Sequence, residues 1–318
     1  MHRGERSLDQ HTLASKTMID FNTSANKKYG AANDFVIDWD WGQSTAKRKI
    51  DLGEGNNFLL GFGDNKEIKS GSGDDFIYLI GGDQTVESSG GNNIIYTSYG
   101  DDKVLLGDGD DYVNSGSGDD LISTSGGNDV IVSGDGVDTI FTGSGNDVVF
   151  AGEGDDYVVV GIGTNVVHGG NGDDVITGGK VAGKNYFFGE AGDDTLRGGS
   201  ANDVLNGGSG DDYLEGRGGS NKYVGGSGAD TFALSQYGYH EVMDFNTGEG
   251  DKLVIGQEGL NIDWDGFDAC AYESSGGVQM MMYGYRDSGS SFHALVNSST
   301  MSLQEMQAIA DDANSKYG

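Results

Sequence analysis

The chain of 318 residues contains no proline and a single cysteine. Without proline, its 58 glycines cannot belong to a collagen triple helix, which needs imino acids and a strict period of three. Cys270 alone cannot form an internal disulfide. A cross-link that stabilises this fold must therefore be of another kind, and a metal ion is the obvious candidate.

Basic residues are also few, because 19 Lys and Arg stand against 51 Asp and Glu and the net charge is −32. We expect no nucleic-acid partner, since binding a polyanion needs a basic face. No run of about 18 apolar residues occurs, so we expect no membrane span. The first twenty residues lack the apolar stretch of a cleavable signal. Carboxylates at this density repel one another, which favours divalent cations as partners.

A nine-residue period dominates what is present. Fourteen consecutive nonads run from Leu52 to Thr177, followed by an eleven-residue unit over 178–188 and five more nonads up to Ala233. We number these units 1 to 20, and the eighth position is apolar or aromatic in all of them. One such residue in nine is too sparse for an amphipathic helix but suits a short strand that points one side chain inward. Two nonads then make one turn of a flattened parallel coil.

Units such as Ser115–Ser123 and Gly207–Glu215 fit the pattern G-G-x-G-x-D-x-U-x, in which U is aliphatic. The chain therefore resembles the RTX, or hemolysin-type calcium-binding repeat, family. The resemblance implies an all-β fold, a parallel β-roll that is a right-handed two-sheet solenoid, with capping strands and a short C-terminal helix. We expect an N-terminal extension and capping strand over 1–51, the roll over 52–233, and capping hairpins with a type I secretion signal over 234–318.

The resemblance also implies several Ca²⁺ ions, each held by turn carbonyls and by the position-six aspartates of units n and n+2. Calcium takes six to eight oxygen ligands, which this arrangement can supply. The twelve expected ligands are Asp102, Asp111, Asp120, Asp129, Asp138, Asp147, Asp156, Asp174, Asp194, Asp203, Asp212 and Asp230. They form nine Asp/Asp pairs, of which 174/194 spans the eleven-residue unit. A single Gly-x-Asp-Asp quartet would more simply be a solvated turn, but repetition in fixed register favours metal.

Other residues at position six are expected to weaken or abolish binding. A pair with Asn, such as Asp147/Asn165 or Asp203/Asn221, keeps its oxygens but loses one charge. Lys66 and Gln84 occupy position six in the second and fourth units. We therefore expect the N-terminal end of the coil to be free of metal.

Positions seven and nine flank the inward residue and should point outward. In the odd-numbered units from 1 to 15, fourteen of these sixteen residues are apolar or aromatic. We expect this odd face to pack against a protein or polysaccharide partner, a second copy or the flanks of the same chain. The alternative is that these residues reflect strand propensity alone.

The flanks predict caps for the two ends of the coil. Alternation over 35–41 predicts a strand covering the first rung, with sugar stacking on Trp39 and Trp41 as the alternative. The stretch 242–255 resembles the segment that closes RTX arrays, where Asp244 and Asp251 are possible ligands. Ser302 and the glutamate three residues later form a capping box for a short helix. This tail is either an uncleaved export signal or a helix docked on the last hairpin.

Catalytic motifs are missing, since neither H-E-x-x-H nor G-x-S-x-G occurs. The 51 residues before the repeats are too few for a catalytic domain, so we expect no enzyme. We expect a secreted protein, released or at the cell surface, that folds on binding extracellular Ca²⁺ and serves in surface coating, adhesion or partner recognition. The alternative is an accessory or polysaccharide-binding module of a secreted polysaccharide-modifying enzyme.

Overall fold

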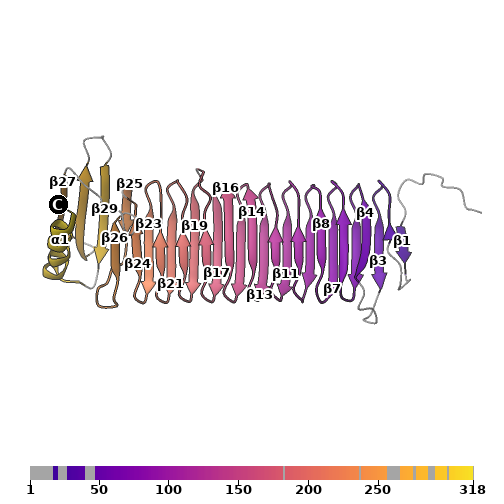
Figure 1. Ribbon diagram of the computed structural model, residues 1–318, viewed down its shortest axis with the longest axis horizontal. Coiled ribbons are helices and arrows are strands. Elements are labelled where there is room, and N and C mark those ends of the chain that lie inside the picture. The colour runs from indigo at the N-terminus through magenta and orange to yellow at the C-terminus, as the bar shows by residue number, and fades with distance from the viewer. Residues whose placement is uncertain are drawn as a thin grey trace, which may run out of the picture.

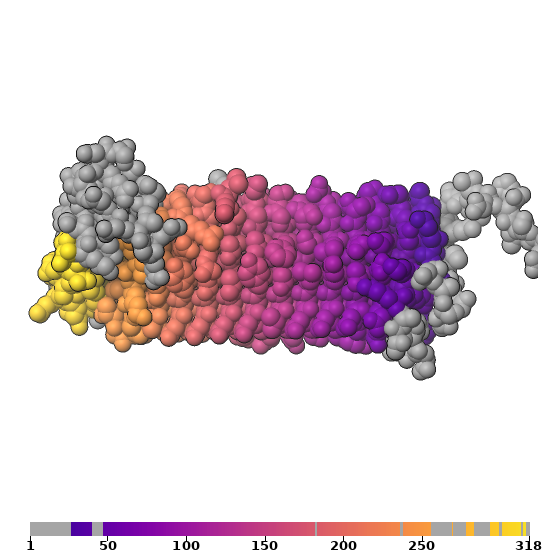
Figure 2. Space-filling view, viewed as in Figure 1, coloured from indigo at the N-terminus to yellow at the C-terminus, as the bar shows by residue number. Residues whose placement is uncertain are grey.

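The computed structural model describes residues 17–20, 27–39, 47–181, 183–235, 238–255, 266–274, 277–285, 291–298 and 301–317. Figure 1 shows an elongated coil of stacked strands, with β1 near one end and a hairpin and α1 at the other. Its described part is a rod of nearly constant width in Figure 2. The predicted all-β parallel roll with one short C-terminal helix is confirmed.

Two sheets form the coil, and over the stacked turns each takes every second strand of the chain. The odd sheet, which holds the strands of the odd-numbered units, has sixteen strands in the order β1 (Thr17–Asp20), β3 (Phe35–Trp39), β5 (Phe58–Phe62), β7 (Phe76–Gly81), β9 (Ile94–Ser98), β11 (Tyr112–Ser117), β13 (Val130–Asp135), β15 (Val148–Glu153), β17 (Asn165–Asn171), β19 (Asn185–Ala191), β21 (Val204–Ser209), β23 (Lys222–Ser227), β25 (Gly238–Val242), β29 (Ser291–Ser298), β28 (Gly277–Tyr285) and β27 (Gly266–Ser274).

The even sheet lies opposite and has thirteen strands. They are β2 (Lys27–Lys28), β4 (Arg48–Gly53), β6 (Lys66–Ser70), β8 (Thr85–Ser88), β10 (Lys103–Leu105), β12 (Leu121–Ser123), β14 (Thr139–Ser144), β16 (Tyr157–Ile162), β18 (Val175–Thr177), β20 (Thr195–Arg197), β22 (Tyr213–Glu215), β24 (Thr231–Leu234) and β26 (Lys252–Ile255). All neighbours in this sheet are parallel.

The core consists of two ladders of position-eight side chains. Each such residue pairs with its equivalent one turn away, which is eighteen residues away between regular nonads, as Val113 pairs with Ile95 and Ile131. Every position-eight side chain from Leu59 to Phe232 is fully buried. Because side chains alternate along a strand, positions six and one also point inward. Leucine, valine or alanine at position one, as in Leu79, adds to this core.

Glycine is required where successive turns stack. A Cβ on Gly154, whose φ is +117°, would lie 2.0 Å from the carbonyl oxygen of Gly136 in the turn below. Gly152, with a φ of +123°, would meet the carbonyl oxygen of Gly134 at the same distance. Both positions combine a left-handed backbone with close backbone approach, which only glycine allows.

The coil extends upstream of Leu52. In β3, Val36 pairs with Leu59, and in β4, Ile50 pairs with Ile68. Both upstream residues are buried like the position-eight residues that they join. The strand predicted as a cap is thus a further rung of the odd sheet, with β1 paired beyond it. Trp41 lies outside the described residues.

The eleven-residue unit leaves the stacking intact. Its extra residues fall in the turn between β18 and β19, after which Asn185 pairs with Asn165 and the usual register resumes. The next even-sheet strand, β20, stacks on β18 in the normal way. The insertion is therefore absorbed in a turn on one side of the coil.

At the C-terminal end, β29, β28 and β27 continue the odd sheet, and the last two pairings are antiparallel. Helix α1 (Leu303–Tyr317) begins with the predicted capping box: the N–H and hydroxyl of Ser302 donate to Glu305 at 2.8 and 2.7 Å. Met306 and Ala310 are buried, whereas Leu303 is exposed. The helix docks on β27, where Asn314 hydrogen-bonds both the N–H and the carbonyl of Ala269.

Candidate metal centre

The position-six aspartates form continuous ladders inside the turns. Each is buried, and its Oδ1 accepts a hydrogen bond from the backbone N–H of the position-six residue one turn earlier. The N–H of Asp102 donates to Asp120 at 2.7 Å, and that of Asp120 donates to Asp138 at 2.8 Å. One carboxylate oxygen thus joins consecutive turns.

The second oxygen has no such partner in ten of the twelve predicted ligands. Their Oδ2 atoms are buried and accept no hydrogen bond in the described structure: Asp102, Asp111, Asp120, Asp129, Asp138, Asp147, Asp156, Asp174, Asp194 and Asp212. A buried carboxylate oxygen without a partner is costly, because water no longer solvates its charge. Rows of such oxygens fit a bound cation.

The electrostatics of the metal-free carboxylates point the same way. Burial raises the pKa of Asp102 and of Asp156 to about 8, and that of Asp174 to about 7. Neighbouring carboxylates add to the effect, as Asp138 and Asp174 do at Asp156. Protons would therefore neutralise much of the row near neutral pH, unless a divalent cation stabilises the ionised form.

The ladders lie on two edges of the roll that differ in composition. The even edge is the row of position-six residues in even-numbered units: Lys66, Gln84, Asp102, Asp120, Asp138, Asp156, Asp174, Asp194, Asp212 and Asp230. The odd edge is the equivalent row in odd-numbered units: Asn57, Asp75, Asn93, Asp111, Asp129, Asp147, Asn165, Asn185, Asp203 and Asn221. Seven of the nine predicted Asp/Asp pairs fall on the even edge, in one unbroken run.

The pair that spans the eleven-residue unit has ordinary geometry. The N–H of Asp174 donates to Oδ1 of Asp194 at 2.8 Å, as in the neighbouring pairs. Both residues lie on the even edge, whereas the inserted residues fall in an odd-unit turn. On the odd edge, the insertion interrupts the ladder, because the N–H of Asn165 donates to the carbonyl of Lys184 instead.

Two predicted ligands, Asp203 and Asp230, lack the unpartnered buried Oδ2 atom of the others, and one residue that was not predicted has it. Both oxygens of Asp203 accept backbone hydrogen bonds, from Asn185 at 2.8 Å and Gly199 at 2.7 Å. Asp230 keeps the ladder bond from Asp212 but is not among the residues with an unpartnered buried oxygen. Asp75 has an unpartnered buried Oδ2. Because it stands at position six of unit 3, the sequence alone could have identified it as a candidate ligand.

The asparagines correct an expectation. Their side-chain oxygen faces the backbone rather than a metal: Oδ1 of Asn93 accepts from the N–H of Asp75, while its Nδ2 donates to the carbonyl of Gly91 at 2.8 Å. Asn221 is arranged in the same way, between the N–H of Asp203 and the carbonyl of Gly218. An asparagine at position six thus directs its N–H₂ group, and not an oxygen, towards the carbonyls of its own turn.

Asp244 and Asp251 close the array through hydrogen bonds. Oδ1 of Asp251 continues the even-edge ladder by accepting from the N–H of Asp230 at 3.0 Å, and its Oδ2 accepts from Asn246 at 2.7 Å. The two oxygens of Asp244 accept from the N–H groups of consecutive glycines, 225 and 226. Both carboxylates therefore cap the last turn.

Position one divides the even edge further. In units 6, 8 and 10 it is a hydroxyl residue that links turns, as Ser115 does by donating to the carbonyl of Ser133 at 3.1 Å. From Gly169 onward it is glycine, and a Cβ there would lie 2.1 Å from Oδ2 of Asp174. Glycine thus leaves space for the carboxylate, whereas in the earlier units a hydroxyl side chain lies beside it.

The donor set fits calcium rather than a softer metal. Among the described residues, no group of three or more His, Cys, Asp and Glu side chains gathers to hold an ion by itself. Backbone oxygens must supply the remaining ligands, and calcium accepts carbonyl and carboxylate oxygens together. The residues that would hold it are the unpartnered Oδ2 atoms and the glycine-rich turns around them.

The comparison with protein families bears on this centre. A model of the RTX calcium-binding nonapeptide repeat, four copies long, matches in ten overlapping stretches that together run from residue 49 to residue 232. The chain belongs to the RTX calcium-binding repeat family. It is accordingly a calcium-binding β-roll protein, and the matched stretches contain all twelve expected position-six ligands. No curated protein matches the chain significantly.

Proposed function

We propose that this RTX roll works outside the cell as a non-catalytic protein that folds on calcium and then recognises a partner through its odd face. The observation that carries the proposal is the row of buried carboxylates with unpartnered oxygens on the even edge. Without calcium this row opposes folding, and with calcium it stabilises the coil, since binding free energy becomes folding free energy.

Secretion follows from the calcium supply. Sites of this oxygen-rich kind work at up to about millimolar calcium outside cells, far above cytosolic levels. The chain would thus leave the cell loosely folded and form its roll outside. Among the described residues, no helix is long and apolar enough to cross a membrane. We assign the export signal to the tail that contains α1, and normal export after deletion of residues 300–318 would refute that assignment.

The odd face offers the recognition surface. It carries exposed Ile94 and Phe150, which are 40% and 43% exposed, and stacked aromatic rows. An open groove of about 360 Å³ lies at its N-terminal part, and Asn56, Phe58, Asp74 and Phe76 are among the residues that line it. An apolar surface of this kind suits a protein partner, because positions seven and nine of the odd units 1 to 15 carry no Asp, Glu, Lys or Arg although the whole chain is strongly acidic.

A polysaccharide ligand receives less support from the same surface. Phe58 stacks on Phe76 with ring centroids 5.1 Å apart and planes 2° apart, and Phe35 stacks on Phe58 in the same way. The ring faces therefore cover one another and only their edges point outward. A sugar needs an open ring face for stacking, so these rows favour a protein surface over a glycan.

A non-catalytic role is supported by how the acids are used. The ladder carboxylates hold consecutive turns together through backbone N–H groups, and most of their other oxygens are buried without a hydrogen-bond partner. Acid–base catalysis needs a carboxyl group within reach of a substrate, in a cleft. The described acids at position six are buried instead.

Circular dichroism of the full chain in excess EGTA and in millimolar calcium tests the coupling. We expect the β-sheet signal to fall strongly in EGTA and to return on adding calcium. Hydrogen exchange then locates the change along the chain. Equal protection of residues 97–233 in EGTA and in calcium would refute calcium-coupled folding.

The partner surface is tested with a matched pair of double variants. Ile94→Ser with Phe150→Ser alters the odd face, and Phe141→Ser with Tyr157→Ser alters equally exposed residues of the even sheet. In calcium, we expect the first pair alone to reduce binding of the purified protein to intact producing cells or its self-association. Equal behaviour of both variants would refute a role for the odd face.

A further inference from the structure

Several position-six residues carry a nitrogen donor in place of a carboxylate. Asn57 and Asn93 each donate through Nδ2 to the carbonyl two residues earlier in their own turn, at 2.8 Å. Gln84 donates through Nε2 to the equivalent carbonyl, that of Gly82. The same turn carbonyls in Asp rungs receive no hydrogen from the carboxylate. A nitrogen donor at position six thus gives a turn carbonyl oxygen a partner within the chain, in the place of a calcium ion bound from solution.

We propose that these donors replace calcium rung by rung, and that residues 48–96 consequently form a segment that stays folded without metal. The inference rests on the proposed calcium-coupled folding of the remaining turns. In this segment, position six is a donor in every rung except that of Asp75, as far as the described residues show. From Asp102 to Asp156, by contrast, every rung carries an aspartate.

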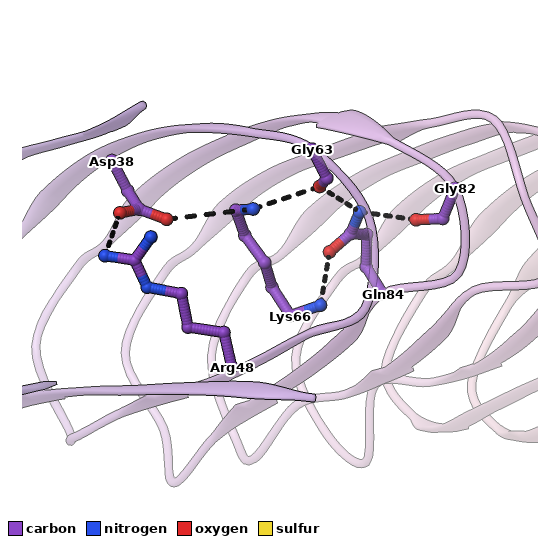
Figure 3. Close-up of polar contacts among 6 residues, drawn as sticks. All are labelled: Asp38, Arg48, Gly63, Lys66, Gly82 and Gln84. Atoms are coloured by element: carbon purple, nitrogen blue, oxygen red, sulfur yellow. Dashed lines mark hydrogen bonds and ion pairs between the residues drawn. The ribbon is translucent and has the colours of Figure 1, made fainter. Parts of the chain in front are cut away.

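Lys66 is the clearest case, because it places a basic side chain at position six of the even edge, where later units carry an aspartate, and points it towards Asp38 and Gly63 (Figure 3). The side chain is 1% exposed, and its Nζ lies 3.1 Å from the carbonyl oxygen of Gly63 and 3.7 Å from Oδ2 of Asp38. Nε2 of Gln84 reaches the same Gly63 carbonyl at 3.0 Å. A buried ammonium is stable only when such oxygens surround it, and these are the oxygen types that calcium binds.

Arg48 extends this arrangement by one turn. It stands eighteen residues before Lys66, pairs with it in register, and is 7% exposed. Its guanidinium contacts Oδ1 of Asp38, the carboxylate that Lys66 contacts from the other side. The even edge therefore begins with two cations and an amide before its aspartates start, so the first turns contain their own positive charge.

Hydrogen exchange of the full chain, read by mass spectrometry, tests the proposal. In excess EGTA we expect slow exchange for peptides within 48–96 and fast exchange for peptides within 102–230, with protection of the latter restored by calcium. Fast exchange of both regions in EGTA would overturn the inference while leaving calcium-coupled folding intact. Slow exchange of both would instead refute the coupling on which it rests.

Lys66→Met isolates the internal cation, and Lys69→Met on the same strand is the control, because Lys69 is exposed and pairs with Glu87 at the surface. In EGTA, we expect Lys66→Met to speed exchange of 48–96 by at least about tenfold, as when one partner of a buried ion pair is lost. The control should leave exchange unchanged. Equal exchange in the two variants would overturn the role of Lys66.

Gln84→Asp provides a gain-of-metal test that does not depend on Lys66. It extends the aspartate row next to Asp102, so we expect one more calcium per chain by elemental analysis and loss of protection near β8 in EGTA. Asn92→Asp adds the same charge at an exposed position and should change neither. An unchanged calcium count and unchanged exchange in Gln84→Asp would overturn the inference.

Discussion

The even edge and the odd edge are built from the same nine-residue unit, yet they use it differently. The even edge carries aspartate in every turn from Asp102 to Asp230, whereas the odd edge alternates runs of aspartate with asparagine. Backbone geometry is alike on both, since the aspartates at position six accept the N–H from the turn before. The difference shows that the period sets the direction of a side chain, whereas the residue type decides whether a turn carries a carboxylate.

Acidification of the metal-free protein should have the largest effect, because it acts on all ladder carboxylates together. Burial raises the pKa of Asp102 to about 8 and that of Asp120 to about 6, above the value of an unfolded chain near 3.8. At pH values between the unfolded pKa and the raised pKa of the folded roll, the roll binds more protons than the unfolded chain. The stability of the metal-free roll therefore falls as the pH rises through this range.

Lowering the pH from about 8 to about 5.5 should therefore increase the β-sheet signal of the metal-free protein. Calcium affinity should change in the opposite direction, since the ion must displace protons. Circular dichroism of resin-stripped protein without chelator, with light scattering to detect aggregation, measures the first effect. A metal-free roll that weakens on acidification would contradict the assigned pKa shifts.

Removing aspartates from the two edges should separate them next. Asp138→Asn with Asp156→Asn affects three even-edge pairs, whereas Asp129→Asn with Asp147→Asn affects the two Asp/Asp pairs of the odd edge. At a calcium concentration about a hundredfold above the dissociation constant, each lost ion lowers the free energy of unfolding by about 2.7 kcal/mol. The even-edge variant should therefore lose about 8 kcal/mol and the odd-edge variant about 5 kcal/mol. Denaturant unfolding in calcium measures the loss, and equal losses would show that the edges bind calcium alike.

Converting an odd-edge donor to a carboxylate should make that edge resemble the even one. Asn93→Asp would create an unbroken row of five aspartates from Asp75 to Asp147, and remove the hydrogen bond to the carbonyl of Gly91. We expect higher calcium binding by titration, together with a loss of about 1 to 3 kcal/mol of local stability in EGTA. No gain in calcium would indicate that a carboxylate row alone does not make a site.

The smallest effect is expected at Asp203, where the odd edge already satisfies both carboxylate oxygens. Asp203→Asn should leave the number of bound calcium ions unchanged and reduce stability by only about 1 kcal/mol, through one lost hydrogen bond. Asp194→Asn, on the even edge at a similar depth, is the comparison. Loss of a calcium ion in Asp203→Asn would show that this residue is a ligand after all.

Much of the fold could be predicted from spacing alone. A residue at position eight must point between the sheets if the strands stack in register, and all twenty such side chains from Leu59 onward are buried. The two edges could also have been recognised, because reading position six every eighteen residues separates Asp102 to Asp230 from the mixed row. The same spacing connects Arg48 to Lys66, upstream of the clear period.

Other features required coordinates. The orientation of Asn93 depends on where the neighbouring N–H and the carbonyl of Gly91 lie, which composition does not reveal. The contact of Asp38 with Arg48 and Lys66 joins strands on both sheets across a stretch whose spacing is no longer nine. Both oxygens of Asp203 are used because its turn places Gly199 within reach.

The two-unit turn has a consequence for how such a chain can change its length. Deleting or duplicating eighteen residues removes or adds one whole turn, and every downstream aspartate keeps its edge. Changing the length by nine residues would exchange the edges for every unit that follows. The apolar outward positions of the odd face, such as that of Ile94, would move to the opposite sheet, and the even-edge row of aspartates that ends at Asp230 would be broken. Variation by pairs of repeats is therefore neutral for the architecture, while variation by single repeats is not.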